Sequence, residues 1–394
     1  MKKVIFCKKC VESSERFIGS ITFNDKKEDK KTLTSFNKDN VCSACSYFEY
    51  KAKINWKERE RELSELLNQH RRNDGYYDVL VPGSGGKDSR FVAHILKTKY
   101  KMNPLTCTWA PHSYTDIGWK NFQSWVNSGF DNILITPDGK VHRQLTKLSF
   151  TNLLHPFQPF AIGQSIIPIK IALEKKIKLI VYGDSQAEVG VGGNLFSFND
   201  KYRNILLQSY NKFEDIHLSG YSIKELEEEH KINRKHLNLY IPAKQEELEK
   251  NNIQAIKMPY FLNYNPQSNF YYAIENTNFE VNPEGRSEGT YTKYASLDDK
   301  IDGLHYYTWF IKTGRGRATG DAALEIRNKI ITRDEGIALV KKYDGEFPKK
   351  YFNEILEYLD MSEEDFNKTI DKFRPNHLWK KINSKWELLQ AVWK

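Results

Sequence analysis

The 394-residue sequence contains no apolar run near the roughly 20 residues that a membrane-spanning helix needs. Its first 14 residues also lack the apolar core of a secretory signal peptide. No segment repeats at a fixed period. Hydrophobic residues make up 39% of the chain and charged residues 28%, which is typical of a globular protein and not of a disordered one. We therefore expect a globular cytoplasmic protein that is long enough for two or three domains.

Cysteine is scarce, and four of the five cysteines form two close pairs, Cys7 with Cys10 and Cys42 with Cys45. In a reducing compartment such pairs favour a metal site over disulfides. The two-residue spacing lets both thiolates of a pair face one ion, and four thiolates leave no open coordination position. We predict a structural zinc ribbon over residues 1–50, with an elongated hairpin that has a strand at residues 21–23. An iron–sulfur cluster is the alternative, since four thiolates can also hold one.

Acidic residues are outnumbered by basic ones, 51 against 60, which gives a net charge of +9. This excess suits an anionic ligand such as ATP, a nucleotide sugar or RNA, but it does not choose among them. The basic residues are dispersed and mix with acidic ones in runs such as residues 26–31, a pattern that is typical of a solvated surface.

Strand and helix patterns alternate through the middle of the chain. Apolar runs predict strands at 77–81, 105–109, 132–136 and 179–182, and helical spacing predicts helices at 56–70, after residue 87, at 119–126 and at 162–175. This alternation predicts an α/β fold, a doubly wound parallel sheet over residues 76–250, preceded by a linker helix in 51–75. The polar stretch near 190–250 is interpreted as an insertion. Helical patterns predict a mainly helical C-terminal region over 251–394.

A glycine-rich loop, Ser84-Gly85-Gly86-Lys87-Asp88-Ser89, directly follows the first of these strands and opens a helix. Its glycines let backbone N–H groups approach phosphate oxygens, and the helix directs its positive end at the same anion. The loop lacks features of a Walker A loop, namely the earlier glycine and the Ser or Thr after the lysine. A tight turn with a helix cap is the structural alternative. We predict that this loop binds a phosphate-bearing anion.

In this context the loop resembles that of the PP-loop ATP pyrophosphatases of the adenine nucleotide alpha hydrolase-like fold, which adenylate a substrate oxygen and release pyrophosphate. More of the chain resembles one branch, the N-acetyl sugar amidotransferases of pseudaminic acid and lipopolysaccharide B-band O-antigen pathways. The segments that carry this resemblance are the cysteine pairs and residues 108–112, 116–122, 129–132, 156–160, 163–164, 312–318 with Asp321, 325–327 and 333–336. The chain departs from the family at Gly183-Asp184-Ser185 and Glu188-Val189-Gly190, where the family has Gly-Glu-Asn and Glu-Tyr-Gly. This departure leaves the particular sugar open.

The resemblance implies an ATP-dependent amidotransferase of bacterial surface glycan biosynthesis. Adenylation would make the acetamido oxygen of an N-acetylated sugar or nucleotide sugar a leaving group, and ammonia would then give an acetamidino sugar. The implied cofactors are ATP, Mg²⁺ and structural Zn²⁺. Ammonia is expected from a separate glutaminase, a HisH-like subunit alone or with a HisF-like subunit. Cys107 has no glutaminase-like setting and residue 2 is not cysteine. Membranes and nucleic acids are not expected partners.

The candidate site residues follow from the loop and from the resemblance. ATP is expected at Ser84, Gly85, Gly86, Lys87, Asp88 and Ser89. Catalytic roles are expected for Lys87, Asp184, Lys312 and Arg317. Asp88 and Asp184 are expected to hold Mg²⁺. Substrate contacts are expected from His112, Trp119, Gln164, Glu188 and Arg315. The structural alternatives are a basic surface turn at 312–317 and a packing role for His112.

The strongest rival function is that of a tRNA thiolase, because some of these enzymes also join zinc knuckles to this loop, and the basic charge suits RNA. Such enzymes usually need further cysteines near the ATP site, and here only Cys107 is left over. A non-enzymatic zinc-ribbon scaffold on a degenerate nucleotide fold is the third reading. It is disfavoured because the loop keeps all of its polar residues.

Overall fold

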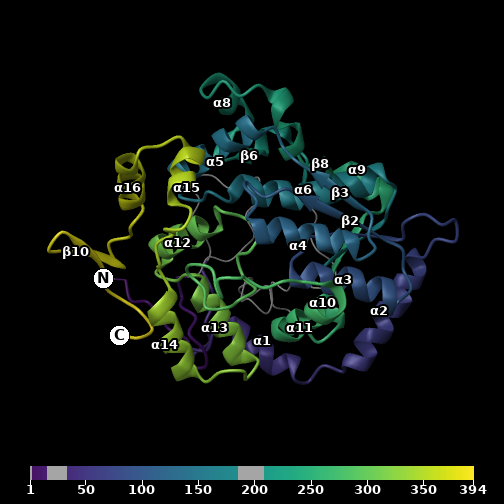
Figure 1. Cartoon of the computed structure of the whole chain (residues 1–394), viewed down its shortest axis with the longest axis horizontal. Helices are drawn as coiled ribbons and strands as arrows, with labels where there is room; N and C mark the ends of the chain where they lie inside the picture. The colour runs from purple at the N-terminus through teal and green to yellow at the C-terminus, as the bar shows by residue number, and fades with distance from the viewer. Residues whose placement is uncertain (1, 16–32, 185–207) are drawn as a thin grey trace.

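The structure is a computed structural model that describes residues 2–15, 33–184 and 208–394 (Figure 1). The strand expected at residues 21–23, the candidate residue Glu188 and the first part of the expected insertion lie outside the described residues.

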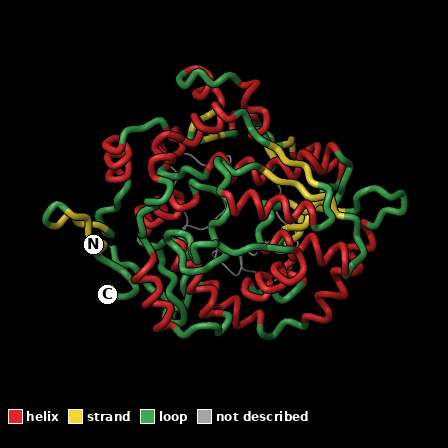
Figure 2. Tube along the Cα trace, viewed as in Figure 1, coloured by secondary structure: helices red, strands yellow, loops and turns green. Residues whose placement is uncertain are grey.

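A five-stranded parallel sheet forms the centre of the α/β part of the molecule (Figure 2). Its spatial order is β3 (Asn132–Ile135), β2 (Pro104–Trp109), β1 (Val79–Pro82), β4 (Leu179–Tyr182) and β9 (Gln254–Lys257). All neighbouring strands are parallel. The doubly wound α/β fold is thereby confirmed. The strand β9 was not predicted, and it extends the sheet beyond residue 250 into the region that was assigned to C-terminal helices.

The strands are apolar because each is covered on both faces. On one face, Leu80, Leu105 and Ile180 pack with helices α5 (Gly139–Leu153) and α6 (Gln158–Glu174). On the other face, Val81 and Val181 pack with α2 (Trp56–His70), α3 (Lys87–Thr98) and α4 (Asp116–Asn127). Two hydrophobic cores therefore fix the sheet between two helical layers, and the carboxyl ends of its strands share one edge.

The described part of the expected insertion is a packed layer rather than an irregular excursion. Its short elements bury Leu218, Leu226, Leu237 and Tyr240 in the same core as α6. In chain order they are β5 (Ser209–Tyr210), η3 (Phe213–Asp215), β6 (His217–Leu218), β7 (Tyr221–Ser222), α8 (Ile223–Glu228), η4 (Arg234–Tyr240), β8 (Ala243–Lys244) and α9 (Gln245–Asn251).

The C-terminal region is mainly helical, as predicted. It comprises α10 (Met258–Phe261), α11 (Pro266–Thr277), α12 (Asp302–Thr313), α13 (Arg317–Arg327), α14 (Arg333–Tyr343), α15 (Phe352–Leu359), α16 (Glu363–Lys372) and the hairpin β10 (Trp379–Ile382) and β11 (Lys385–Leu388). The helix α11 packs along α3, where the ring of Tyr272 lies edge-on to that of Phe91. Part of this region therefore supports the α/β sheet.

The cysteine segment at the N-terminus lies against α13 and α14 (Figure 1). Cys7, Cys10, Cys42 and Cys45 share a buried cluster with Ala322, Ala323 and Val340 of these helices. The helix α1 (Ser43–Lys51) follows the second cysteine pair. Among the described helices, none is both long and apolar enough to cross a membrane.

Candidate active site and metal centre

The glycine-rich loop leaves β1 in a conformation that requires glycine. Gly85 has a φ of +87°, and a Cβ at this position would lie 3.1 Å from the carbonyl oxygen of Asn121. A Cβ on Gly83 would lie 2.2 Å from the Cβ of Ser89. No side chain caps α3 at Gly86, and the Ser89 hydroxyl donates to the Gly86 carbonyl at 3.0 Å instead. The N–H groups that open α3 are thus not used by a capping side chain, in contrast to the helix-cap alternative.

The loop lies at the point where the strand order reverses. β1 is followed in the chain by β2 on one side, and β4 lies on its other side. In open α/β sheets, ligands bind in the crevice beyond the carboxyl ends of the two strands at this point. Gly183, just after β4, contacts the loop, since a Cβ there would lie 2.8 Å from the carbonyl oxygen of Asp88. The chain therefore places the predicted phosphate loop where the fold accepts a ligand.

The two charged residues of the loop pair with each other. Lys87 Nζ lies 2.6 Å from Asp88 Oδ2, and the side-chain amide of Asn269 in α11 donates to Asp88 Oδ1 at 3.0 Å. Asp184, the second expected Mg²⁺ ligand, keeps 60% of its side chain exposed and forms an ion pair with Lys257. Asp88 and Asp184 come from neighbouring strand ends, and magnesium binding by them stays a prediction.

Two adjacent carboxylates from the segment before α12 reach this edge of the sheet. Asp298 accepts a hydrogen bond from Ser84 of the loop, and Asp299 accepts from the N–H and Nδ1 of His112 at 2.8 and 2.7 Å. Burial raises the pKa of Asp298, and the bond from Ser84 partly offsets this rise. A β-bridge between Tyr114 and Asp299 fixes the segment to the connection between β2 and α4.

His112 is enclosed by rings. Its side chain has no exposed area, and its ring centroid lies 4.7 Å from those of His142 and Phe157 and 5.3 Å from that of Phe160. The Nε2 atom has no hydrogen-bond partner among the described residues. Asp299 therefore fixes the orientation of a fully buried imidazole beside the loop, and contact with a substrate stays a prediction.

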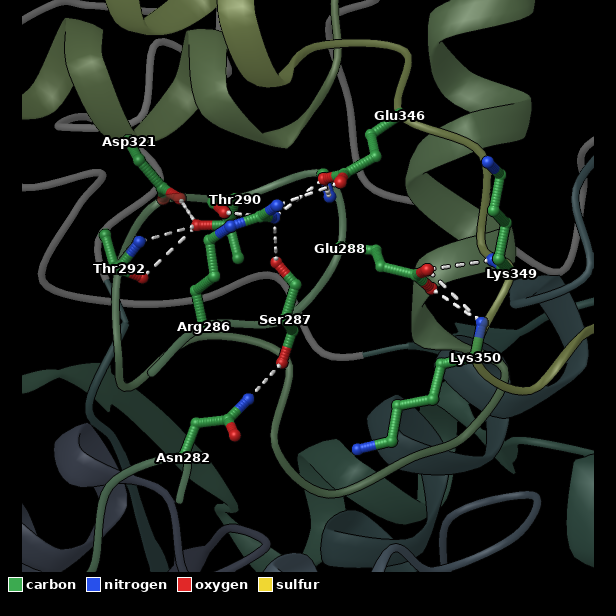
Figure 3. Close-up of polar contacts among 11 residues, drawn as sticks. Asn282, Arg286, Ser287, Glu288, Thr290, Thr292, Asp321, Glu346, Lys349 and Lys350 are labelled. Carbon is green, nitrogen blue, oxygen red and sulfur yellow. Dashed lines mark hydrogen bonds and ion pairs between the residues drawn. The ribbon is translucent and has the colours of Figure 1, made fainter. Parts of the chain in front are cut away.

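Arg317 opens α13 and is held by two side chains, Asp321 and Tyr306. Its Nε donates to Asp321 at 2.9 Å and its Nη1 donates to the hydroxyl of Tyr306 at 2.6 Å. The hydroxyl of Thr290 donates to the other oxygen of Asp321 at 2.7 Å (Figure 3). Burial raises the pKa of Asp302 to about 7, while the charge of Arg317 acts to lower it. Arg317 is thus a preorganised guanidinium.

Tyr294 lies beside Lys87 of the phosphate loop and within electrostatic range of Arg317. Lys87 Nζ lies 5.3 Å from the centre of the Tyr294 ring. Burial raises the pKa of the Tyr294 hydroxyl, and the charges of Asp321 and Asp88 raise it further while Arg317 lowers it. Charged residues of both the α/β part and the C-terminal part therefore influence the pKa of the Tyr294 hydroxyl.

The loop that contains Thr290 is braced from the C-terminal side. Figure 3 shows Arg286 paired with both carboxylate oxygens of Glu346, at 2.7 and 2.9 Å. Glu288 accepts from the backbone N–H groups of Lys349 and Lys350 at 2.9 and 3.2 Å. This bracing holds the segment that orients Asp321.

Lys312, Arg315 and Arg317 are close in the sequence but contact different parts of the fold. Lys312 ends α12 and donates to the Leu153 carbonyl at 3.1 Å. Arg315 is buried against Glu12 of the cysteine segment at 2.8 Å. The helix α12 ends at Gly314, whose φ of +69° is left-handed, and Arg317 begins the next helix. Of the three, Arg317 acts electrostatically on Tyr294.

Two further candidate residues lie at the surface. Trp119 on α4 is 41% exposed and stacks on Phe122 at 5.5 Å. Gln164 is exposed on α6, next to Gly163, whose backbone packs tightly on the ring of Trp109. Their contacts with a substrate stay predictions.

The four paired cysteines form a candidate metal centre. Their sulfur atoms all lie within 4.8 Å of one another, with Cys7 and Cys45 at 3.8 Å and Cys10 and Cys42 at 3.7 Å. Tetrahedral thiolates at about 2.3 Å from one ion are about 3.8 Å apart, so this set fits a single tetrahedral ion. The cluster supports the predicted metal binding.

Arginines of the C-terminal helices surround this centre. Arg327 Nη1 lies 3.7 Å from the Cys10 sulfur, and Arg333 donates to the carbonyls of Cys10 and Cys7 at 3.1 and 3.2 Å. With the Arg315–Glu12 pair, these contacts join the first residues of the chain to α13 and α14.

Sequence reasoning missed Arg90, Asn269, Tyr294, Asp298 and Asp299. Arg90 carried one usable signal, since it directly follows the loop motif at the start of an apolar helical pattern. Asn269, Tyr294 and Asp298 meet the loop, and Asp299 meets His112, through contacts between residues far apart in the chain, which no local pattern encodes.

Comparison with known proteins identifies the C-terminal part of the chain. The family model of the LPS biosynthesis protein WbpG-like C-terminal domain matches residues 288–392. Residues 288–392 are thus similar to this domain, and we call them the WbpG-like domain. This domain contains Arg317 and the helices that contact the cysteine centre, and it supports the resemblance to the amidotransferases of surface polysaccharide pathways.

Other similarities are more limited. The uncharacterized protein MJ1599 of Methanocaldococcus jannaschii is 30% identical over 84 residues, which are 21% of this chain and 30% of that protein. A predicted tRNA methyltransferase subunit from Methanocaldococcus jannaschii aligns with 19% identity over 50% of this chain and 74% of its own, with a TM-score of 0.26. The U34-tRNA thiolase NcsA from Methanococcus maripaludis, solved with its 4Fe–4S cluster, aligns with 13% identity over 86% and 89%, with a TM-score of 0.32. Scores this low establish no shared function.

Proposed function

We propose that this protein is an ATP-dependent amidotransferase that converts the acetamido group of an N-acetylated sugar, free or nucleotide-linked, into an acetamidino group. The observation that supports the proposal most is the phosphate loop at the reversal point of the sheet. The WbpG-like domain, which brings Arg317 toward that loop, adds the link to surface glycan biosynthesis.

The chemistry begins with activation of a poor electrophile. The acetamido oxygen attacks the α-phosphorus of ATP, the bond to pyrophosphate breaks, and an O-adenyl imidate forms. Loop N–H groups and Lys87 would hold the phosphates, and the guanidinium fork of Arg317 suits the departing pyrophosphate. Mg²⁺ bound by Asp88 and Asp184 would neutralise phosphate charge.

Ammonia then attacks the imidate carbon. The new C–N bond forms, the C–O bond to AMP breaks, and one proton leaves the nitrogen. Ammonia would come from a separate HisH-like glutaminase, alone or with a HisF-like subunit. The fifth cysteine cannot serve as a glutaminase nucleophile, because Cys107 is buried within β2 and burial raises its thiol pKa.

We propose zinc as the ion of the cysteine centre, in a structural role. The sulfur separations fit one tetrahedral ion, whereas in a cubic iron–sulfur cluster the four thiolates bind different irons and lie farther apart. Metal analysis of the purified protein separates the two, since only the cluster gives iron, sulfide and a visible absorption band.

The tRNA thiolase alternative has less support in the site itself. Such enzymes usually need further cysteines near the ATP site. Four of the five cysteines gather in the cluster at the N-terminus, and the fifth is buried in the sheet. None of them contacts the phosphate loop through a side-chain bond in the part of the chain that the structure describes.

The decisive experiment incubates the protein with ATP, Mg²⁺, ammonium and candidate N-acetylated nucleotide sugars. Mass spectrometry should find an acetamide converted to an amidine, a loss of about 1 Da, together with AMP and pyrophosphate. Formation of ADP, or pyrophosphate release with tRNA but with no sugar, would contradict the proposal. Robust use of glutamine by this chain alone would contradict the separate glutaminase.

A further inference from the structure

Arg90 is a buried arginine directly behind the phosphate loop. Its side chain belongs to α3 and has no exposed area. Its Nε donates to the carbonyl oxygen of Gly85 at 2.6 Å, and one terminal nitrogen donates to the Ser124 hydroxyl at 2.6 Å. The terminal nitrogens also donate to the carbonyls of Asn121 and Thr277. One guanidinium thus joins the loop to α4 and α11.

The bond to Gly85 sets the direction of the next peptide N–H. In a trans peptide the C=O and the N–H point in opposite directions. Because the Gly85 carbonyl points inward to Arg90, the N–H of Gly86 points outward, toward the face where the loop would meet phosphates. The left-handed φ of Gly85, +87°, permits this arrangement.

Arg90 also supplies charge that no acid neutralises. Within the described residues no carboxylate lies at ion-pair distance from it, and its partners are carbonyl and hydroxyl oxygens. Burial lowers the pKa of Arg90 to about 9, so the side chain remains cationic at pH 7. Thr277 is the last residue of α11, where the helix dipole is negative and favours a cation. The charge of Lys87, by contrast, is paired with Asp88.

We propose that Arg90 is the positioning residue of the phosphate loop: it fixes the Gly85–Gly86 peptide for phosphate binding and places an unneutralised positive charge beneath the polyphosphate. This inference rests on the proposed binding of ATP by the loop. The conformational entropy of the loop is then lost when the protein folds and not when ATP binds. The phosphates therefore meet N–H donors that are already aligned.

The test compares ATP with adenosine, which lacks phosphates, as ligands of the whole protein. In Arg90→Lys the charge is kept, but a single ammonium cannot bond Gly85, Asn121 and Thr277 in one geometry. We expect at least a tenfold loss of affinity for ATP by calorimetry and an unchanged affinity for adenosine by ligand-observed NMR. A variant that merely loosened the fold would weaken both ligands.

Arg143→Lys is the matched control. Arg143 also donates to helix-end carbonyls, those of Glu357 and Tyr358, but from α5 and away from the loop. Its substitution should leave both affinities unchanged. If Arg90→Lys does not fold, Ser124→Ala removes one partner of Arg90, together with the bonds of this hydroxyl to the carbonyls of Asn121 and Asn278. It should weaken ATP binding two- to threefold, again without effect on adenosine.

Unchanged ATP affinity in Arg90→Lys or, failing that, in Ser124→Ala would overturn the inference and leave the proposed function standing. Equal losses for ATP and adenosine would also overturn it, because they indicate a general structural role. A wild-type chain that binds neither ligand would refute the proposed function, and this inference with it.

Discussion

Residues that are neighbours in the sequence make different contacts at this site. Asp298 bonds the phosphate loop while Asp299 holds His112. Lys312 and Arg315 serve contacts with Leu153 and Glu12, whereas Arg317 faces Tyr306 and Asp321. A cationic run in the sequence is therefore a poor guide to a cationic site, because the direction of each side chain depends on the turn that carries it.

Arg317 should be required for turnover and not for folding. Its substitution by alanine removes a guanidinium fork beside the loop, and we expect turnover of ATP to fall about 100-fold, as when one preorganised electrostatic donor is lost. Pyrophosphate release under saturating substrate measures this. Arg374→Ala is the control, because Arg374 likewise pairs with an aspartate close by in the chain, Asp371 near the end of α16, and packs on an aromatic ring, Trp379.

The control variant should keep near-wild-type turnover. Comparable losses in the two variants, or a wild-type rate in Arg317→Ala, would remove Arg317 from the reaction. Circular dichroism melting of both variants checks that neither result arises from unfolding.

The loop glycines and the paired cysteines were predictable because their signal is local. A strand, a glycine-rich turn and a helix occupy one continuous stretch, and each cysteine pair has its own spacing. The contacts of Asp298 with Ser84 and of Asn269 with Asp88 were not predictable, because they join segments that only the folded chain brings together.

At the scale of elements, α13 connects the two candidate centres. Its first residue, Arg317, belongs to the cluster beside the loop, and its last, Arg327, lies 3.7 Å from the Cys10 sulfur. An 11-residue helix is about 15 Å long, so the centres lie at opposite ends of one rigid element. The cysteine segment thus buttresses the WbpG-like domain.

Metal loss should therefore destabilise the C-terminal helices as well as the first residues. In Cys10→Ser we expect loss of bound metal and a marked fall in the melting temperature, since a structural zinc site contributes on the order of 10 kcal/mol. Metal content by mass spectrometry and thermal melting measure the two effects. The fifth cysteine gives the control, because Cys107→Ala should keep the metal and cost only about 1 kcal/mol of packing.

Full metal content in Cys10→Ser, or metal loss in Cys107→Ala, would contradict the assigned centre. Proteolysis within α13 and α14 after chelation would locate the destabilised region, whereas protection of these helices would show that the centre supports only its own segment.

The strands of the sheet were predictable from apolar runs, with one exception. The strand β9 reads Gln254-Ala255-Ile256-Lys257, and its two apolar residues are too few to form a run. It becomes a strand because β4 offers it an edge and because Ile256 fills the core beside Val181. A strand that forms mainly because a neighbouring strand pairs with it cannot be predicted from its own residues.

At the scale of the whole molecule, a group of buried histidines lies between the sheet and α12. His305 of α12 stacks on Phe157 at 4.8 Å, and Phe157 contacts His112, which in turn contacts His142. These rings join the α/β layers to the WbpG-like domain. Protonation of any of these histidines would place a charge in the contact region between the sheet and the WbpG-like domain.

Acid should therefore weaken the fold in a way that depends on His305. Burial lowers the pKa of His305 to about 3, and Lys312 and Arg317 add repulsion. Its usual value is 6.5, so between pH 6.5 and about 3 the unfolded chain binds a proton that the folded chain does not. By linkage, stability falls as the pH falls through this window, by up to about 1.4 kcal/mol per pH unit for one histidine.

Two buried carboxyls act in the opposite direction. Burial raises the pKa of Asp302 to about 7 and that of Asp344 to about 6, so the folded chain holds their protons more tightly and gains stability on acidification. The slope of wild-type stability against pH mixes both effects. His305→Phe keeps a ring in the stack and removes one titrating group, so the difference between the two slopes isolates His305. Urea unfolding between pH 6.5 and 4 should show a shallower loss of stability in the variant.

The exposed His236 provides the control for this measurement. Its side chain is 41% exposed, and it is not part of the chain of ring contacts through Phe157. His236→Phe should leave the wild-type slope unchanged. Parallel plots of stability against pH for His305→Phe and wild type would contradict this prediction. They would mean that His305 accepts its proton in the folded state. The region between the sheet and the WbpG-like domain must then admit water at moderately acidic pH without unfolding.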